Sequence, residues 1–203
     1  MVNSNLIVLS EKYNCFAWLV ARTGSNHMVS ILKNFNFKIY NCIGKNKKLY
    51  DNELKSIHTY NLFEGSETYK FLISVRNPYA REVSSFRMNK YVENPKESFK
   101  DFLEKKYYSQ DTSIYYNRPD RLPDYYVRME HMFEDYSKIP FIVESEYFKS
   151  GKLEKQVSVK INYNSLDDRR WEDFYDDNIA DIVYYNNLKD FNLFGYDKNS
   201  YKK

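Results

Sequence analysis

The chain has 203 residues, which suits a single domain with one substantial core. Its 31 Lys and Arg and 28 Asp and Glu leave a net charge of +3, too little for a whole-protein field that would attract nucleic acid. Because no apolar run approaches the roughly 20 residues that span a bilayer, and residues 1–14 lack signal-peptide features, we expect a cytoplasmic protein without a membrane span.

A short apolar strand, a tight turn and an amphipathic helix are the first elements that the sequence predicts. The run from Phe16 to Val20 suits a buried strand of a parallel sheet, and it ends at a Gly-containing turn. We expect Ser25 or Asn26 to cap the helix that follows. This helix carries an apolar stripe at the spacing i, i+3, i+4, i+7, formed by Met28, Ile31, Leu32 and Phe35.

A second strand-to-helix switch begins at residues 71–75, an apolar run that predicts another strand. Asn77 then suits an N-cap, and Pro78 suits the first position of a helix. Further along, we expect a long loop, a strand and a C-terminal helix over residues 109–124, 125–129 and 171–188. The sequence therefore predicts an α/β fold, a single domain over residues 1–203 with a central, mostly parallel sheet flanked by helices.

Residues 21–27 (Ala-Arg-Thr-Gly-Ser-Asn-His) occupy the turn between the first predicted strand and helix. Unpaired backbone N–H groups and the positive end of the helix dipole face outward together at such a turn and bind phosphate. Gly24 allows an anion close to the main chain, and Arg22 supplies a permanent charge. Further short donors come from Thr23, Ser25 and Asn26. An ordinary tight turn with a capping Ser explains the heptapeptide equally well, and the missing GxxxxGK[ST] pattern disfavours an ordinary P-loop NTPase.

The helix after the second strand has two different faces. At about 100° per residue, Asn77, Arg81 and Ser84 fall on one side of it. The opposite, apolar side carries Tyr79, Val83 and Phe86. We expect the polar side to present a guanidinium and a hydroxyl, with Arg76 aimed at the same region as a second anion site. A solvated surface face with incidental charges is the alternative.

Together the two segments resemble the sulfotransferase family, which carries a 5′-phosphosulfate loop after its first strand and a 3′-phosphate motif R-x-P-x-x-R-x-x-S. The loop is similar to residues 21–27, and the motif is similar to Arg76, Pro78, Arg81 and Ser84. Weaker similarity covers about residues 13–197, including the closing segment 190–196. The resemblance implies a P-loop NTPase-like fold and transfer of a sulfuryl group from 3′-phosphoadenosine 5′-phosphosulfate (PAPS), with no metal required.

Carried over by position, the resemblance assigns the 5′-phosphosulfate to residues 22–26 and the 3′-phosphate to Arg76 and Ser84. His27 in the same loop suits a phosphate contact or a cap. Many relatives have Lys where this chain has Arg22, and a planar guanidinium is not equivalent to a compact ammonium at the leaving oxygen. The segment Arg169-Arg170-Trp171 could add an adenine contact or a further charge.

The acceptor must lose a proton as it attacks sulfur, so the site needs a general base. We expect His58, which lies upstream of Arg76 where many family members have their catalytic His, with Glu53 and Glu64 as alternatives. Arg22 would stabilise the leaving group, adenosine 3′,5′-bisphosphate. The acceptor group is a hydroxyl or an amine, and the acceptor molecule is open, with carbohydrate and small alcohol among the candidates. Rival readings are an atypical small-molecule kinase and a nucleotide-binding module without turnover.

Overall fold

The computed structural model of the chain describes residues 5–43, 66–92, 95–109, 122–159 and 169–202. The chain divides into two units. We call residues 2–75 with 117–161 the sheet unit, and residues 76–116 with 162–203 the helical unit. The single domain over the whole chain stays a prediction.

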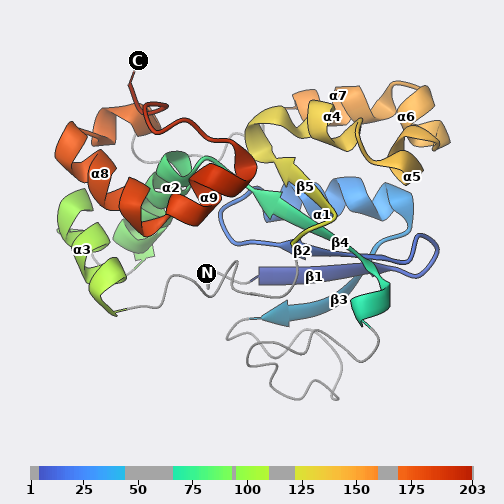
Figure 1. Cartoon of the computed structure of the whole chain (residues 1–203), viewed down its shortest axis with the longest axis horizontal. Helices are drawn as coiled ribbons and strands as arrows, with labels where there is room; N and C mark the ends of the chain where they lie inside the picture. The colour runs from blue at the N-terminus through green and yellow to red at the C-terminus, as the bar shows by residue number, and fades with distance from the viewer. Residues whose placement is uncertain (1–4, 44–65, 93–94, 110–121, 160–168, 203) are drawn as a thin grey trace. The chain divides into compact units, whose positions relative to one another are not determined.

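The sheet unit contains one five-stranded sheet in the order β3-β1-β2-β4-β5 (Figure 1). Its strands are β1 (Asn5–Ser10), β2 (Cys15–Leu19), β3 (Lys38–Ile43), β4 (Lys70–Val75) and β5 (Tyr125–Arg128). β2 pairs parallel with β4, and β4 with β5, whereas β1 pairs antiparallel with both β2 and β3. The α/β class is confirmed, but the sheet is mixed, because the N-terminal hairpin adds a reversed strand that the sequence analysis did not expect.

The hairpin between β1 and β2 depends on a four-residue turn, Glu11 to Asn14. Asn14 has φ 47°, a left-handed conformation that Asn adopts more readily than most residues. Its amide donates to the Glu11 carbonyl at 3.1 Å, and its side chain donates to the Thr68 carbonyl at 2.7 Å. The turn is therefore tied to the segment that leads into β4, which pairs with β2.

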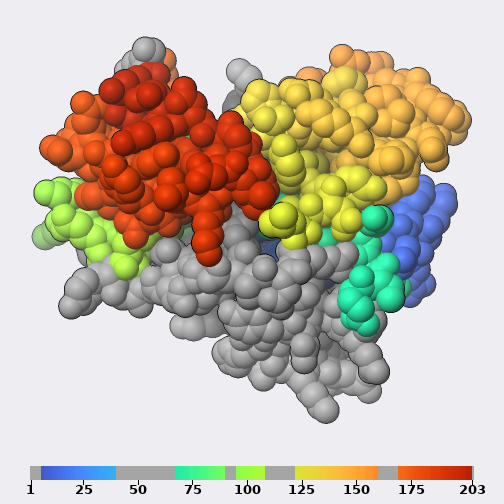
Figure 2. Space-filling model, in the orientation of Figure 1, coloured from blue at the N-terminus to red at the C-terminus, as the bar shows by residue number. Residues whose placement is uncertain are grey.

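Helices cover one face of the sheet, the face to which Ala17, Leu19 and Val127 point (Figure 1). In Figure 2 the yellow and orange atoms of the later helices form one continuous surface. Met28, Ile31 and other apolar side chains of these helices form the core with the strands. The helical segments of the sheet unit, of which η2 only leads into β4, are α1 (Ser25–Leu32), η1 (Lys33–Phe35), η2 (Ser66–Thr68), η4 (Met129–His131), α4 (Met132–Tyr136), α5 (Pro140–Val143), α6 (Glu146–Lys149) and α7 (Lys152–Ser158).

The helical unit packs around a second core that is rich in aromatic rings. Its segments are α2 (Pro78–Val92), α3 (Phe99–Ser109), η5 (Trp171–Phe174), α8 (Asp177–Asn186) and α9 (Leu188–Phe194). The predicted apolar face of α2 is confirmed, since Tyr79, Val83 and Phe86 are all buried. Tyr79 lies edge-on to Tyr175 and Phe191, with ring centroids 5.0 and 5.1 Å away, a favourable geometry for aromatic pairs.

The expected helix over residues 171–188 is wrong as a single element. The chain leaves η5 at Tyr175 in an extended conformation, and α8 then starts with Asp176 as its N-cap. The Asp176 carboxylate accepts from the Ile179 amide at 2.8 Å, so the break satisfies a donor at the new helix start. The strands predicted over 16–20, 71–75 and 125–129 are confirmed within a residue. Most of the expected loop at 109–124 lies outside the described residues. No helix in the described part of the chain is both long and apolar enough to cross a membrane.

Candidate functional site

The loop between β2 and α1 holds the first predicted anion site at the carboxyl ends of the parallel strands. Arg22 and Gly24 both have left-handed backbones, with φ 69° and 73°. For Arg this conformation costs about 1–2 kcal/mol, which the surrounding structure must offset. The other non-glycine residues with positive φ in the described segments are both asparagines, which tolerate it more easily. The loop is thus held in one tight shape.

A pair of buried hydroxyls anchors this loop to the neighbouring strand. The Thr23 hydroxyl donates to the Val20 carbonyl at 2.6 Å and lies 2.5 Å from the Ser74 hydroxyl of β4. Because Thr23 has one hydroxyl proton and uses it on Val20, Ser74 is the donor between them. The Ser74 oxygen also accepts from the Val20 amide at 2.9 Å. Thr23 therefore supports the loop from within, and its predicted contact with a ligand stays a prediction.

The predicted capping of α1 by Ser25 or Asn26 is wrong, because both residues already lie inside the helix. Gly24 is the N-cap, and it has no side chain with which to cap the helix. The first turn also contains no acidic residue. The positive end of the helix dipole is therefore not offset by a carboxylate of the helix itself, which favours an approaching anion.

Gly24 also allows a close contact with the residue that follows β5. A Cβ atom at this position would lie 3.3 Å from the Met129 sulfur and 3.4 Å from its terminal methyl group. The distance to the sulfur is tighter than ordinary van der Waals contact, and the distance to the methyl group is at its limit. The missing side chain thus admits the thioether of Met129. The contact with Met129 was not predicted, since nothing local in the sequence pairs residues so far apart.

His27 is half-buried, and its Nε2 atom is buried without a hydrogen-bond partner among the described residues. Burial lowers its pKa from 6.5, so the imidazole is neutral at pH 7. The capping role expected of His27 is wrong, because Gly24 occupies that position, and its contact with phosphate stays a prediction. A neutral imidazole can still donate or accept one hydrogen bond.

The second motif starts where β4 ends, with Arg76 directly after Val75. The predicted N-cap is confirmed by geometry, since the Asn77 side-chain oxygen accepts from the Tyr79 amide at 3.0 Å. The Asn77 amide group also donates to the Ser200 hydroxyl at 2.9 Å. Pro78 is the first residue of α2, as predicted. The Asn77 side chain thus holds the start of α2 through one hydrogen bond within the helix and one to the C-terminal segment.

Arg81 does not present its guanidinium on an open face, contrary to the sequence analysis. Only 8% of the residue is exposed, and Nη1 lies 2.7 Å from the Asp190 carboxylate. Nη2 donates to the Asn187 side-chain oxygen at 2.6 Å. Burial raises the pKa of Asp190, and Arg81 works against that rise. Because a buried charge needs a partner, Arg81 joins α2 to the α8–α9 junction and is already neutralised.

Ser84 and Arg87 form a polar stretch of α2 that keeps free donors. Ser84 is half-buried, and its hydroxyl has no hydrogen-bond partner within the described segments. One turn later, the Arg87 Nε atom is buried and has no hydrogen-bond acceptor among the described residues. Arg87 also forms no ion pair with any of these residues. Its guanidinium lies 5.1 Å from the Phe174 ring centroid and donates to the Arg169 carbonyl. Arg87 was not among the predicted site residues, although its i+3 spacing from Ser84 places the two side chains on the same side of the helix.

Arg169 and Arg170, named in the sequence analysis as a further source of charge, have different surroundings. The Arg169 guanidinium lies 4.1 Å from the centroid of the Phe174 ring, on which Arg87 also rests. Such contacts stabilise a cation by about 0.5–2 kcal/mol without neutralising its charge. Arg170 instead caps η5, where its amide donates to Asp173 at 2.9 Å. Two guanidinium groups therefore meet at one ring beside α2.

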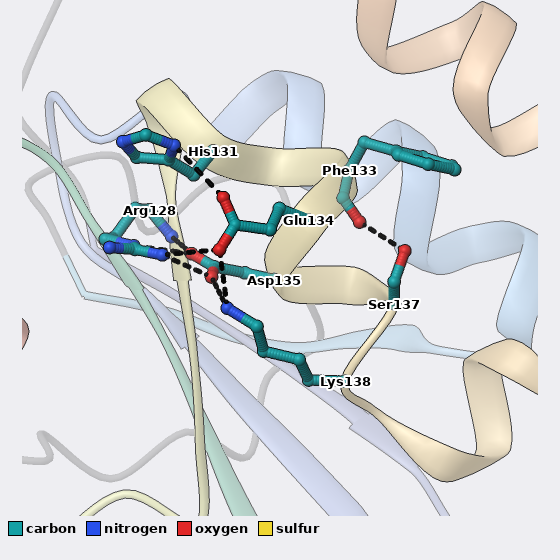
Figure 3. Close-up of polar contacts among 7 residues, drawn as sticks. All are labelled: Arg128, His131, Phe133, Glu134, Asp135, Ser137 and Lys138. Atoms are coloured by element: carbon teal, nitrogen blue, oxygen red, sulfur yellow. Dashed lines mark hydrogen bonds and ion pairs between the residues drawn. The ribbon is translucent and has the colours of Figure 1, made fainter.

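The groups after β5 form a charge network of their own (Figure 3). The Arg128 guanidinium makes two hydrogen bonds to Asp135, of 2.9 and 2.7 Å. Burial works to raise the pKa of Asp135, but hydrogen bonds from Arg128 and Lys138 outweigh it and hold the pKa below its usual value. His131, one of the three histidines, lies 3.4 Å from Glu134 at the exposed edge of this network. The charged groups of this network thus form ion pairs with one another.

The predicted general base His58 lies outside the described residues, as do the alternatives Glu53 and Glu64. Residues 22–27 belong to the sheet unit, and Arg76 and Ser84 belong to the helical unit, so their joint action on one nucleotide stays a prediction. In the described part of the chain, no group of three or more His, Cys, Asp or Glu side chains lies together to hold a metal ion.

Comparison with known proteins does not assign the chain to a family. No protein-family model matches the sequence, and neither curated proteins nor solved structures provide a match.

Proposed function

We propose that the protein is a cytoplasmic sulfotransferase that uses PAPS as donor, with a P-loop NTPase-like arrangement around the β2–α1 loop. The observation that carries the proposal is the geometry of this loop. It has two left-handed residues, a helix start without a side-chain cap, and anchoring through Ser74 to a parallel neighbour strand. Such a strand–loop–helix unit offers backbone N–H groups and a helix dipole to a phosphosulfate. The same neighbour strand, β4, leads directly into Arg76.

The residues have distinct roles in this proposal. The 5′-phosphosulfate binds the loop amides with Arg22, Gly24, Ser25 and Asn26, while His27 contributes a neutral hydrogen bond. The 3′-phosphate binds Arg76 and Ser84. Arg87 is added to this second group, because a half-buried guanidinium without an ion pair among the described residues is unfavourable until an anion neutralises it.

The reaction is an in-line transfer between two oxygens. The acceptor oxygen forms a bond to sulfur while the bond from sulfur to the bridging phosphate oxygen breaks, and its electron pair stays on that phosphate oxygen. Arg22 and the loop amides stabilise the charge that develops there. The acceptor proton passes to His58, or to Glu53 or Glu64. Arg22 acts only as a fixed positive charge, because guanidinium does not deprotonate in proteins.

Calorimetry tests donor recognition directly. Wild-type protein is expected to bind adenosine 3′,5′-bisphosphate and to bind ATP with Mg²⁺ far more weakly. Arg76→Ala and Arg87→Met should each weaken bisphosphate binding about 10- to 100-fold, since each removes a charged hydrogen-bond donor. Lys149→Met is the matched control, because this lysine lies exposed on α6 of the sheet unit. Preferred binding of ATP with Mg²⁺ would point to the kinase alternative.

Turnover is tested separately, with PAPS and a panel of carbohydrate and small-alcohol acceptors. His58→Ala is expected to keep bisphosphate binding and to lose sulfate transfer. Unchanged transfer in this variant would move the base to Glu53 or Glu64. Bisphosphate binding without transfer to any acceptor would support the binding module instead of an enzyme.

A further inference from the structure

A cavity of the sheet unit is lined by residues of the β1–β2 turn and of the segment from α5 to α6. Figure 1 shows this turn and these helices at the end of the sheet that lies away from the β2–α1 loop. The volume of the cavity is about 510 Å³, within the range of small-molecule sites. It is lined by Lys12, Tyr13, Asn34, Asn36, Phe141, Glu144, Ser145, Glu146 and Tyr147. Since β2 has five residues of about 3.3 Å rise, the cavity and the loop are separated by the length of a strand of about 16 Å.

Stacked aromatic rings form the apolar part of this cavity. Tyr13 and Phe141 stack with centroids 4.6 Å apart and an interplanar angle of 17°. Phe141 is itself held by Phe37 and by Tyr125, at 6.1 and 6.2 Å. Because rings on several sides fix Phe141, the orientation of Tyr13 is fixed before any ligand arrives, which lowers the entropic cost of binding.

Polar groups of both kinds surround this ring stack. The Tyr13 hydroxyl, the side-chain amide group of Asn36 and the Glu144 carboxylate have no hydrogen-bond partner within the described segments, and Lys12 forms no ion pair there. Lys12 Nζ lies 5.0 Å from the centroid of the Tyr13 ring. The Lys12 ammonium can only donate hydrogen bonds, the Glu144 carboxylate can only accept them, and the Tyr13 hydroxyl and the Asn36 side-chain amide group can do both. Three of these residues, Lys12, Asn36 and Glu144, are exposed, so their polar groups can exchange water for a ligand.

We propose that this cavity binds a saccharide. A sugar ring has an apolar C–H face, which packs against an aromatic ring, and a rim of hydroxyls, each of which needs donors and acceptors together. The cavity supplies both features side by side, with Tyr13 as the platform and Asn36, Glu144 and Lys12 at the rim. Because it lies at the opposite end of β2 from the loop, this site does not depend on the proposed sulfotransferase activity.

The experiment titrates maltose, cellobiose and N,N′-diacetylchitobiose against the full chain by saturation-transfer NMR and calorimetry. At least one disaccharide is expected to bind with a dissociation constant of about 1 mM or lower. Tyr13→Ala and Asn36→Gly should each weaken that binding about 10-fold or more. Gly is chosen at position 36 because Asn36 has φ 58°, which glycine adopts without strain.

Tyr185→Ala is the matched control, since this tyrosine is 64% exposed and belongs to the helical unit. The Tyr185→Ala variant should bind the disaccharide as tightly as the wild type does. Circular dichroism of each variant checks that the fold persists. Retention on a resin that carries the bound saccharide as a polymer would identify a glycan as the source, whereas binding of the free disaccharide alone would identify a small sugar. Absence of binding for all three probes at about 10 mM, or equal binding by Tyr13→Ala and the wild type, would overturn the proposal.

Discussion

The replacement Gly24→Ala measures how tightly the β2–α1 loop is constrained. The backbone there has φ 73°, so an Ala side chain costs about 1–2 kcal/mol in the free energy of unfolding. The new Cβ also lies 3.3 Å from the Met129 sulfur, and the thioether must shift by a few tenths of an ångström. We expect this crowding to add about 1 kcal/mol, for a total loss of about 2–3 kcal/mol.

Gly151 provides a closely matched control. It is the N-cap of α7 with φ 70°, and a Cβ there meets no atom within 4 Å. Gly151→Ala should therefore show the backbone cost alone, about 1–2 kcal/mol. Urea unfolding followed by circular dichroism gives both values, with the midpoint and the slope compared between variants. In a Met129→Ala background the two glycine replacements should cost the same.

The reasoning would be refuted if Gly24→Ala destabilised the protein no more than Gly151→Ala does. It would also fail if the excess cost of Gly24→Ala persisted after Met129→Ala. The double-mutant cycle isolates the contact, because the coupling energy between neighbouring residues is measured directly.

Two further predictions concern the buried charges of the helical unit. Asp190→Ala removes the nearer of the two carboxylates around the buried Arg81 guanidinium and leaves Glu82, 3.7 Å from Nε. It should lower the free energy of unfolding by about 3 kcal/mol in a urea titration; a loss below about 1 kcal/mol would contradict the structure. For Glu82, burial works to raise the pKa, but Lys106 and Arg81 lower it below 4.5. Because the pKa of Glu82 is lower in the folded protein than in the unfolded chain, its ionised carboxylate stabilises the fold above about pH 4.5, and this stabilisation is lost as the pH falls. Glu82→Gln should therefore flatten the dependence of unfolding free energy on pH below about pH 4.5, and an unchanged slope would count against this pKa shift.

Local sequence patterns correctly predicted those strands and helix starts that are determined by residues close together in the chain. The strand at residues 16–20 and the helix stripe of Met28, Ile31 and Leu32 follow from hydrophobic periodicity, and the start of α2 follows from Asn77 and Pro78. These features depend on neighbours within a few residues. Their confirmation gives the strand–loop–helix unit, on which the proposed function rests.

Other features depend on partners that are distant in the sequence. Arg81 was expected on an open polar face, yet its carboxylate partner Asp190 is more than a hundred residues away. The contact between Gly24 and Met129 spans a similar separation. The cap of α1 was misplaced for a different reason, because Ser25 is a common capping residue and the left-handed conformation of Gly24 is not encoded in a simple pattern. Tertiary context decides such cases.

The hydroxyl pair of Thr23 and Ser74 has a consequence for how this chain could vary. Each oxygen completes the hydrogen bonding of the other inside a site that excludes water, so losing one strands a polar atom. A change at either position alone would be selected against, and so would a paired exchange for two apolar groups, because the buried Val20 amide would then lose the Ser74 oxygen that accepts its hydrogen bond. Positions 23 and 74 are therefore expected to be conserved together, although 50 residues separate them along the chain.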